Sequence, residues 1–168
     1  HERAALLDGG WARWLSATQL SSQDVPKKAR GDFQASTSMM PLATADDVLK
    51  SLDRGDRMVL DARTAERYRG EQEPIDPVAG RIPGARNRPW QQNLNPDQTF
   101  KSTRELRSEF TALLDQRTPD QITHQCGSGV TACHNVFAME LAALRGSALY
   151  GGSWSEWIAD PTRPIATG

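Results

Sequence analysis

The sequence predicts an α/β fold in which a parallel sheet carries helices on both faces. Short, continuous apolar runs alternate along the chain with stretches of helical periodicity, an order typical of parallel strands joined by helices. The chain has 168 residues, 38% of them hydrophobic, which is enough for one substantial core. Its two cysteines, Cys126 and Cys133, are too few for a disulfide framework. The core must therefore come from packing of the helices on the sheet.

Charge and hydropathy exclude several classes of function. The formal net charge is −1, which gives no field to attract nucleic acid or an anionic membrane. No apolar run approaches the roughly 20 residues of a transmembrane helix, and no signal-peptide pattern opens the chain. We expect a soluble, cytoplasmic protein that binds neither nucleic acid nor membrane.

The start of the chain resembles its end. Residues 7–14 and 150–157 share the pattern Gly-x-Trp-x-x-Trp, at an offset of about one domain length. Residues 1–18 are therefore expected to be the last strand and helix of a preceding domain copy, absent here, and chance recurrence of the pattern is the alternative. Residues 19–38 are polar, lack a sustained period and read as an interdomain linker. Residues 39–168 would then form the catalytic domain.

The first helix of that domain has both a start and a stop signal. Thr44 is a typical N-cap, an acidic first turn follows it, and Gly55 ends the apolar periodicity. A buried strand is expected at 58–60, ending at Asp61, and a short helix at 64–69. Thr103 and Ser153 are the expected caps of two later helices. The remaining predictions are a long loop at 70–83, strands at 85–88, 121–125 and 148–150, and a helix at 130–144 ended by Gly146.

Cys126 stands where a strand ends and a glycine-containing turn opens a helix. The first amides of a helix have no intrahelical acceptor, and together with the helix dipole they favour an anion. The same donors favour the thiolate over the thiol. Free cysteines usually just pack in a core, but glycines at 127 and 129 allow a ligand to approach the main chain closely. We therefore interpret the cysteine as a nucleophile in an anion cradle.

Four motifs, in order, resemble those of the rhodanese superfamily. The loop Cys-Gly-Ser-Gly-Val-Thr-Ala at 126–132 is similar to the active-site loop of its 3-mercaptopyruvate sulfurtransferase branch. The other three are Asp-Ala-Arg at 61–63, Gly-Arg-Ile-Pro-Gly-Ala at 80–85 and the Gly-Gly-Ser-Trp segment at 151–154. The resemblance implies a rhodanese-like domain whose central, mostly parallel sheet has five strands.

The resemblance also implies a function. Cys126 would take sulfane sulfur from 3-mercaptopyruvate or thiosulfate as a persulfide and pass it to cyanide or a thiol, such as a small thiol or a thioredoxin-like protein. Arg67 corresponds to the family arginine that holds the anionic end of the donor, and residues of a preceding domain would complete the pocket. No metal or organic cofactor is implied. The implied substrate-binding residues are Arg67, Gly127, Ser128, Gly129, Val130 and Thr131.

The sequence departs from the family pattern at two positions. The mercaptopyruvate branch often has a second substrate arginine after a Glu-Pro pair, whereas this chain has Glu73-Pro74-Ile75-Asp76 there, and Arg81 replaces a histidine. Arg81 either supplies the lost charge or keeps a structural contact. Arg67 itself has an alternative role, as one half of a surface ion pair with Glu66 or Glu71.

Other functional interpretations fit less well. A cysteine phosphatase needs an arginine to grip phosphate, and residue 132 is alanine in a loop one residue shorter than the phosphatase loop. Zinc binding by the neighbouring cysteines and histidines lacks the usual ligand spacing. Cys133 reads as structural, with redox pairing to Cys126 as the minor alternative. His124 reads as a packed strand residue, with a proton shuttle as its alternative, and His134 is expected inside the helix and turned away from the nucleophile. A non-catalytic binding or regulatory domain remains the alternative function.

Overall fold

The computed structural model describes residues 4–35 and 40–168. Residues 1–3 and 36–39, which belong to the predicted tail, linker and first residue of the catalytic domain, lie outside the described residues. The sheet has five strands in the order β1-β5-β4-β2-β3, and each neighbouring pair is parallel. This confirms the predicted sheet. The strands are β1 (Leu42–Ala43), β2 (Met58–Asp61), β3 (Arg86–Asn87), β4 (Ile122–Gln125) and β5 (Ala148–Tyr150).

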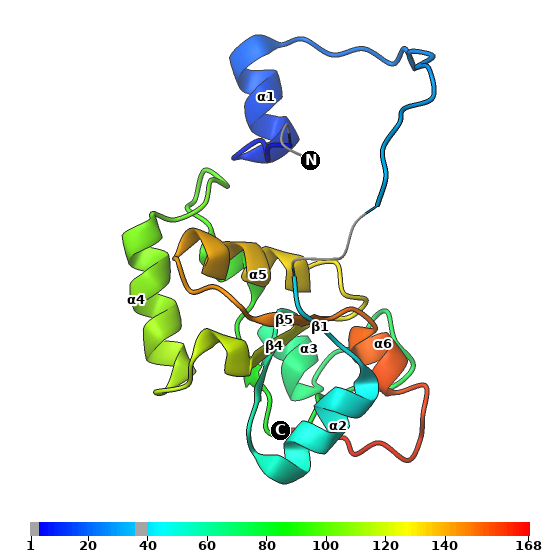
Figure 1. Cartoon of the computed structure of the whole chain (residues 1–168), viewed down its shortest axis with the longest axis vertical. Coiled ribbons are helices and arrows are strands. Elements are labelled where there is room, and N and C mark those ends of the chain that lie inside the picture. The colour runs from blue at the N-terminus through cyan, green and yellow to red at the C-terminus, as the bar shows by residue number, and fades with distance from the viewer. Residues whose placement is uncertain (1–3, 36–39) are drawn as a thin grey trace.

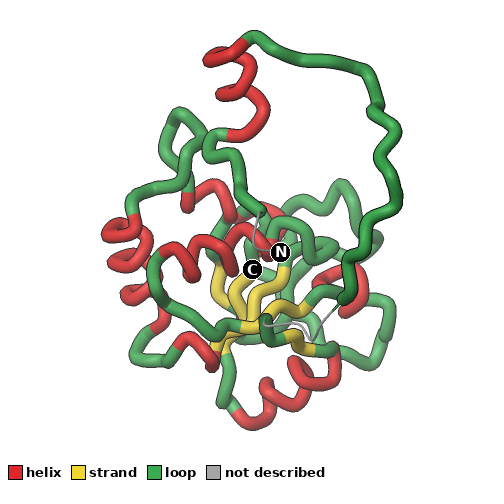
Figure 2. Tube along the Cα trace, turned by 45° about the horizontal axis from the view of Figure 1, so that its top comes forward, coloured by secondary structure: helices red, strands yellow, loops and turns green. Residues whose placement is uncertain are grey.

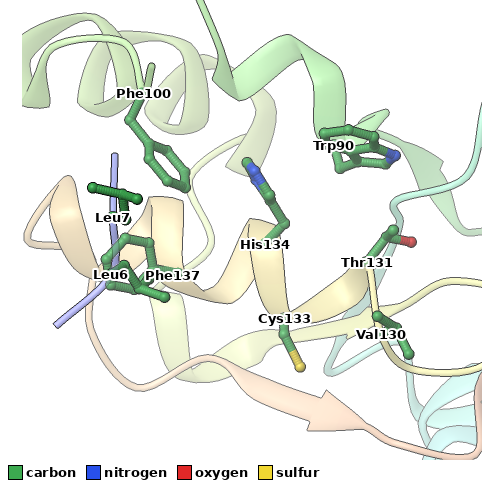
Figure 3. A pocket seen from close by; sticks show the side chains of 9 residues that line it. All are labelled: Leu6, Leu7, Trp90, Phe100, Val130, Thr131, Cys133, His134 and Phe137. Atoms are coloured by element: carbon green, nitrogen blue, oxygen red, sulfur yellow. The ribbon is translucent and has the colours of Figure 1, made fainter. Parts of the chain in front are cut away.

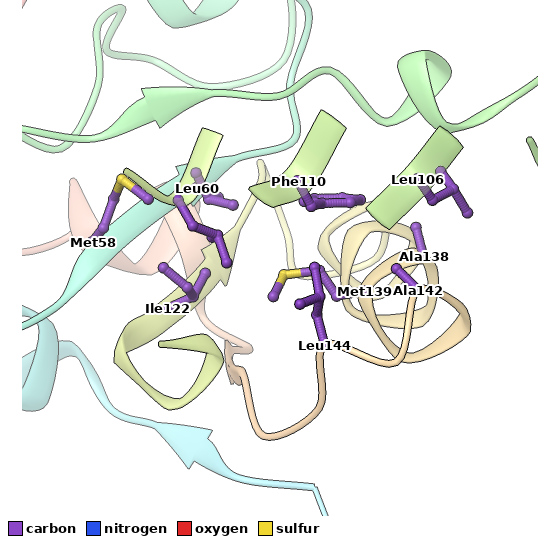
Figure 4. Packing of buried hydrophobic residues seen from close by; sticks show 10 residues of the cluster. Met58, Leu60, Leu106, Phe110, Ile122, Ala138, Met139, Ala142 and Leu144 are labelled. Carbon is purple, nitrogen blue, oxygen red and sulfur yellow. The ribbon is translucent and has the colours of Figure 1, made fainter. Parts of the chain in front are cut away.

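Helices cover both faces of the sheet (Figure 1). On one face Met58, Leu60 and Ile122 pack against helices α4 (Thr103–Leu114) and α5 (Ala132–Leu141) (Figure 4). On the other face Val59 and Tyr150 pack against α2 (Ala45–Arg54) and α6 (Ser153–Trp157). The side chains alternate because successive residues of a strand point to opposite faces. The short helix α3 (Ala65–Arg69) and the 3-10 turns at Trp90–Asn93 and Pro119–Gln121 complete the domain.

Local capping explains where two helices begin. Thr44 forms a capping box with Asp47 at the start of α2, and Gly55 ends that helix at φ +65°, as predicted. Helix α4 begins one residue earlier than expected. Its cap is Ser102, which forms a capping box with Glu105, so the assignment of Thr103 as the cap was wrong.

Helix α5 is shorter than the predicted 130–144. The Cys133 and His134 amides donate to the carbonyls three residues before them, so residues 130 and 131 form a tight turn and not the first turn of an α-helix. At the other end, Ala143 has a φ of +55°, which an α-helix does not accommodate. The apolar periodicity continues through both ends, and this is why periodicity alone overestimated the length.

The N-terminal helix α1 (Gly10–Thr18) lies apart from the sheet and is joined to it by a long segment (Figures 1 and 2). None of its residues is buried, and the Trp11 side chain is 60% exposed. Residues 19–35 contain neither helix nor strand. Across the described ranges 4–35 and 40–168, no helix is both long and apolar enough to cross a lipid bilayer.

Candidate active site

The candidate nucleophile lies at the carboxyl edge of the sheet, where open α/β folds bind their ligands. Cys126 directly follows β4 and is only 2% exposed. It contacts an apolar cluster that includes Ala132 and Val136, yet it also lines a cavity of about 180 Å³. The other residues that line this cavity are Arg67, Ile75, Asp76, Gly127, Ser128, Val130, Thr131 and Ser155. The thiol is thus buried by the protein and opens onto a small cavity.

Most main-chain carbonyls of the loop after Cys126 accept hydrogen bonds, whereas the amides of its described residues donate none. The carbonyls of Cys126 and Gly127 accept the Trp154 and Ser155 amides of α6, at 3.0 and 2.9 Å. The carbonyls of residues 129–131 accept from the first turn of α5. Within the described part of the chain, the amides of residues 127–131 donate to no protein acceptor. Unpaired amides beside a helix N-terminus form an anion-binding main chain.

Glycine is required at 129 by both conformation and space. Gly129 has a φ of +82°, and a Cβ there would overlap the Gly151 carbonyl oxygen. A Cβ on Gly127 would lie 3.3 Å from Nη2 of Arg67, so the guanidinium lies directly against the loop. The structure therefore brings together Cys126, Arg67 and the loop, as predicted from the sequence. Gly129 itself shapes the turn and does not line the cavity.

Ser153 does not cap α6 as predicted. Its Oγ accepts a hydrogen bond from the Cys126 amide at 3.0 Å and donates to the Tyr150 carbonyl at 2.9 Å. The residue at the N-cap position of α6 is Gly152. Ser153 instead fixes the main chain of the nucleophile, and it does so at a φ of +53°. Its hydroxyl finds a partner 27 residues away in the chain, so a local capping rule could not identify it.

Arg67 is held between two carboxylates of the 70–83 loop. Its Nε and Nη2 donate to Glu73 Oε1 at 3.0 and 2.7 Å, and Nη2 also lies 3.1 Å from Asp76 Oδ2. Neither expected surface partner is used, because Glu71 pairs with Arg69 and no bond joins Arg67 to Glu66 in the described structure. The long loop near the site is confirmed, with Ile75 and Asp76 in the cavity lining. Sequence reasoning did not single out Asp76 or Ser155 as site residues.

A buried chain of ion pairs supports Arg67 from behind. The Arg63 side chain is 1% exposed; its Nη2 lies 2.7 Å from Asp61 Oδ2 and its Nη1 lies 3.3 Å from Glu73 Oε2. Burial raises the pKa of Glu73, but the hydrogen bonds from Arg67 and from two loop amides outweigh it, so the net pKa is lowered. Glu73 is therefore ionised and fixes the orientation of Arg67.

The remaining candidate residues take structural positions. Arg81 stacks over the Tyr68 ring at 4.7 Å and does not line the cavity, which favours the structural contact over a substrate role. His124 is fully buried on β4, as expected. Cys133 lies in the first turn of α5 but is exposed, with its thiol 3.4 Å from the Gly129 carbonyl. In the described parts of the chain, no three His, Cys, Asp or Glu side chains gather as metal ligands.

A second, apolar cavity of about 430 Å³ adjoins the first (Figure 3). Val130 and Thr131 line both cavities. His134 points from α5 toward Phe100 and stacks on it at 4.6 Å, so it is turned to this second cavity and not to the nucleophile. Leu6 and Leu7, just before α1, cover one side of it.

Comparison with known proteins identifies relatives for the whole chain. Residues 44–160 match the model of the rhodanese-like domain. A "Probable 3-mercaptopyruvate sulfurtransferase" of Pseudomonas aeruginosa is 47% identical over 163 residues, which cover 97% of this chain and 57% of that protein. A thiosulfate sulfurtransferase of Bos taurus is 33% identical, over 94% of this chain and 54% of that protein. The chain thus spans little more than half the length of these curated relatives.

A solved structure shares the fold over nearly the whole chain. The anaerobic ergothioneine biosynthesis enzyme from Chlorobium limicola, in complex with trimethyl histidine, superposes with a TM-score of 0.82 at 27% identity. The match covers 96% of this chain and 41% of that one.

Proposed function

This chain belongs to the rhodanese-like domain family, and from that premise we propose that it transfers sulfane sulfur through a persulfide on Cys126. The observation that carries the proposal is the run of five amides at 127–131, which donate to no acceptor in the described structure and follow directly after the thiol. Such a main chain stabilises the negative charge of a thiolate, of a persulfide and of a sulfur-containing donor alike.

In the first half-reaction, the Cys126 thiolate attacks the sulfur of the donor. With 3-mercaptopyruvate, the carbon–sulfur bond breaks, its electron pair stays on carbon, and that carbon takes a proton to give pyruvate. With thiosulfate, the sulfur–sulfur bond breaks and sulfite leaves with the electron pair. In the second half-reaction, an acceptor thiolate or cyanide attacks the outer sulfur of the persulfide and releases Cys126. Two steps of this kind replace one more difficult transfer.

The names of the relatives support both donors. One curated relative is named for 3-mercaptopyruvate and another for thiosulfate. The carboxylate end of a keto acid matches a guanidinium such as Arg67, which is why 3-mercaptopyruvate is our first choice and thiosulfate the second. A small thiol or a thioredoxin-like protein is the proposed acceptor. The cytoplasmic location expected from the sequence stays a prediction.

We further propose that residues 1–18 belong to a preceding rhodanese-like copy and that 19–38 link the two. In α6 the two tryptophans of the repeated pattern, Trp154 and Trp157, are fully buried. In α1 their counterparts, Trp11 and Trp14, are 60% and 37% exposed. The tryptophans of the repeated pattern therefore pack into the core in α6 but have no core to pack into in α1. This difference supports the assignment of α1 to another domain. Mass spectrometry of the intact, full-length natural protein tests this proposal. A mass that corresponds to only these 168 residues would refute it.

The sulfurtransferase proposal is tested by thiocyanate and sulfide release with each donor. Cys126→Ser should abolish release and should also abolish the mass increase of one sulfur atom after incubation with donor. Cys133→Ser is the matched control, because this exposed thiol is outside the site cavity, and it should retain activity. Equal activity of the wild type and Cys126→Ser would remove the catalytic assignment and favour the non-catalytic alternative.

A further inference from the structure

The Arg67 guanidinium has one pair of N–H groups left that could bind a ligand carboxylate, and Asp76 already contacts one of the two nitrogens. A guanidinium offers two edges with such a pair, Nε with one Nη and the two Nη atoms together. Glu73 takes the first edge through Nε and Nη2. Asp76 Oδ2 lies 3.1 Å from Nη2, on the second edge. Nη1 donates to no acceptor in the described structure, and it lies beside the loop, 3.4 Å from a Cβ built on Gly127.

Asp76 is fixed in this position. Its side chain is 8% exposed, and its second oxygen, Oδ1, accepts a hydrogen bond from Ser155 Oγ at 2.7 Å. Ser155 Oγ also lies 2.9 Å from the Gly127 carbonyl, so the carboxylate is tied to the loop that carries the nucleophile. Asp76 is not a mobile surface acid that an incoming anion displaces freely.

The charge of the cavity follows from these contacts. Of the described residues that line it, Arg67 is the one cation and Asp76 the one anion. The positive charge of Arg67 is already balanced by Glu73 behind it. A donor that enters this cavity therefore meets an uncompensated carboxylate, and the repulsion doubles when the donor carries two negative charges in place of one.

We propose that Asp76 is a specificity-determining residue that competes with the donor for Arg67 and so selects monoanionic keto-acid thiols over dianionic donors such as thiosulfate. The inference rests on the proposed sulfur transfer for its substrate class. Within the described lining of the cavity, Nη1 of Arg67 and the loop amides are the donors left for the carboxylate of such a thiol. The loop amides remain open to either donor, and Asp76 decides between them.

The kinetic test compares Asp76→Asn with the wild type of the full-length protein. The asparagine keeps an oxygen for Ser155 and removes the charge. We expect KM to fall roughly threefold for 3-mercaptopyruvate and roughly tenfold for thiosulfate, because doubling the donor charge squares the factor. The turnover number kcat should change little for either donor. Glu71→Gln is the matched control, since this exposed acid of the same loop pairs with Arg69 outside the cavity and should leave both KM values unchanged.

A binding test separates this inference from the proposed reaction. In the Cys126→Ser background, calorimetry measures the Kd of pyruvate as the monoanion and of thiosulfate as the dianion, with and without Asp76→Asn. Asp76→Ala serves in the same way if the asparagine variant does not fold. A shift in favour of thiosulfate supports the inference even if the wild type transfers no sulfur. Weaker binding of both anions in the variants, an equal change for both, or no binding of either anion overturns it.

Discussion

His124 should make the stability of this protein depend on pH between neutrality and mild acid. The residue lies on β4, two positions before the nucleophile, and is 0% exposed. Leu60 of β2 lies opposite it in the sheet register. Neither ring nitrogen has a hydrogen-bond partner in the described structure. Burial lowers the pKa of His124 from 6.5 to about 3, because the charged ring would lose its hydration.

The sign and the size of the effect follow from this difference in pKa. Below pH 6.5 the unfolded chain binds a proton at His124 that the folded chain refuses until about pH 3. Acid therefore favours the unfolded state by about 1.4 kcal/mol for each pH unit within that window. Between about pH 8 and about pH 5, the free energy of unfolding should fall by about 2 kcal/mol from this residue alone.

The assay is urea unfolding of the wild type and His124→Leu at the two pH values. Leucine is similar in size to histidine and suits the apolar surroundings, so the variant should fold. The loss of stability on acidification should be about 2 kcal/mol smaller in the variant. Burial also lowers the pKa of His134, but that contribution is common to both proteins and cancels. Parallel pH profiles of the wild type and His124→Leu would refute the reasoning.

Two further substitutions test the ion pairs and the support of the nucleophile. Arg63→Met should lower the free energy of unfolding, measured in urea, by about 3–5 kcal/mol, because it leaves the fully buried Asp61 carboxylate without its ion-pair partner. The control is Arg54→Met at an exposed ion pair, which should change the free energy of unfolding by no more than about 0.5 kcal/mol. Ser153→Gly relieves a backbone at φ +53° but removes the hydroxyl that accepts from the Cys126 amide. We expect a roughly tenfold loss of kcat in sulfur transfer, which corresponds to the free energy of one hydrogen bond. An unchanged kcat would show that the hydroxyl does not position the nucleophile.

Local signals predicted the fold well where cause and effect lie close together in the chain. Thr44 and Gly55 bound α2 through contacts within a few residues, and both assignments are confirmed. The edge strand β1 has two residues, too few to produce a periodic pattern, so the sequence does not indicate where this fifth strand lies. The helix after the nucleophile was overestimated because its apolar pattern extends past Ala143, whose positive φ ends the helix.

The sequence motifs predict the site residues that lie within them, but not the contacts that residues outside the motifs make with them. Cys126 and Arg67 meet as expected, because each follows the carboxyl end of a parallel strand and those ends share one edge of the sheet. The acids that hold Arg67 come from a loop without periodicity, and any of several carboxylates nearby could have been its partner. The three-dimensional structure is needed to see that Glu73 and Asp76 are the partners of Arg67 and that the Ser153 hydroxyl accepts from the Cys126 amide.

The main-chain amides after Cys126 attract anions through the partial positive charge of their N–H groups. This attraction does not depend on the protonation of a side chain. An exposed peptide group presents both a carbonyl oxygen and an amide hydrogen to water. In this loop the carbonyls of residues 127 and 129–131 accept hydrogen bonds, while the amides of residues 127–131 donate to no acceptor in the described structure. Amide hydrogens do not titrate over the range in which proteins stay folded. The attraction of the loop for anions should therefore persist in alkali, where a lysine in its place would already be losing its charge.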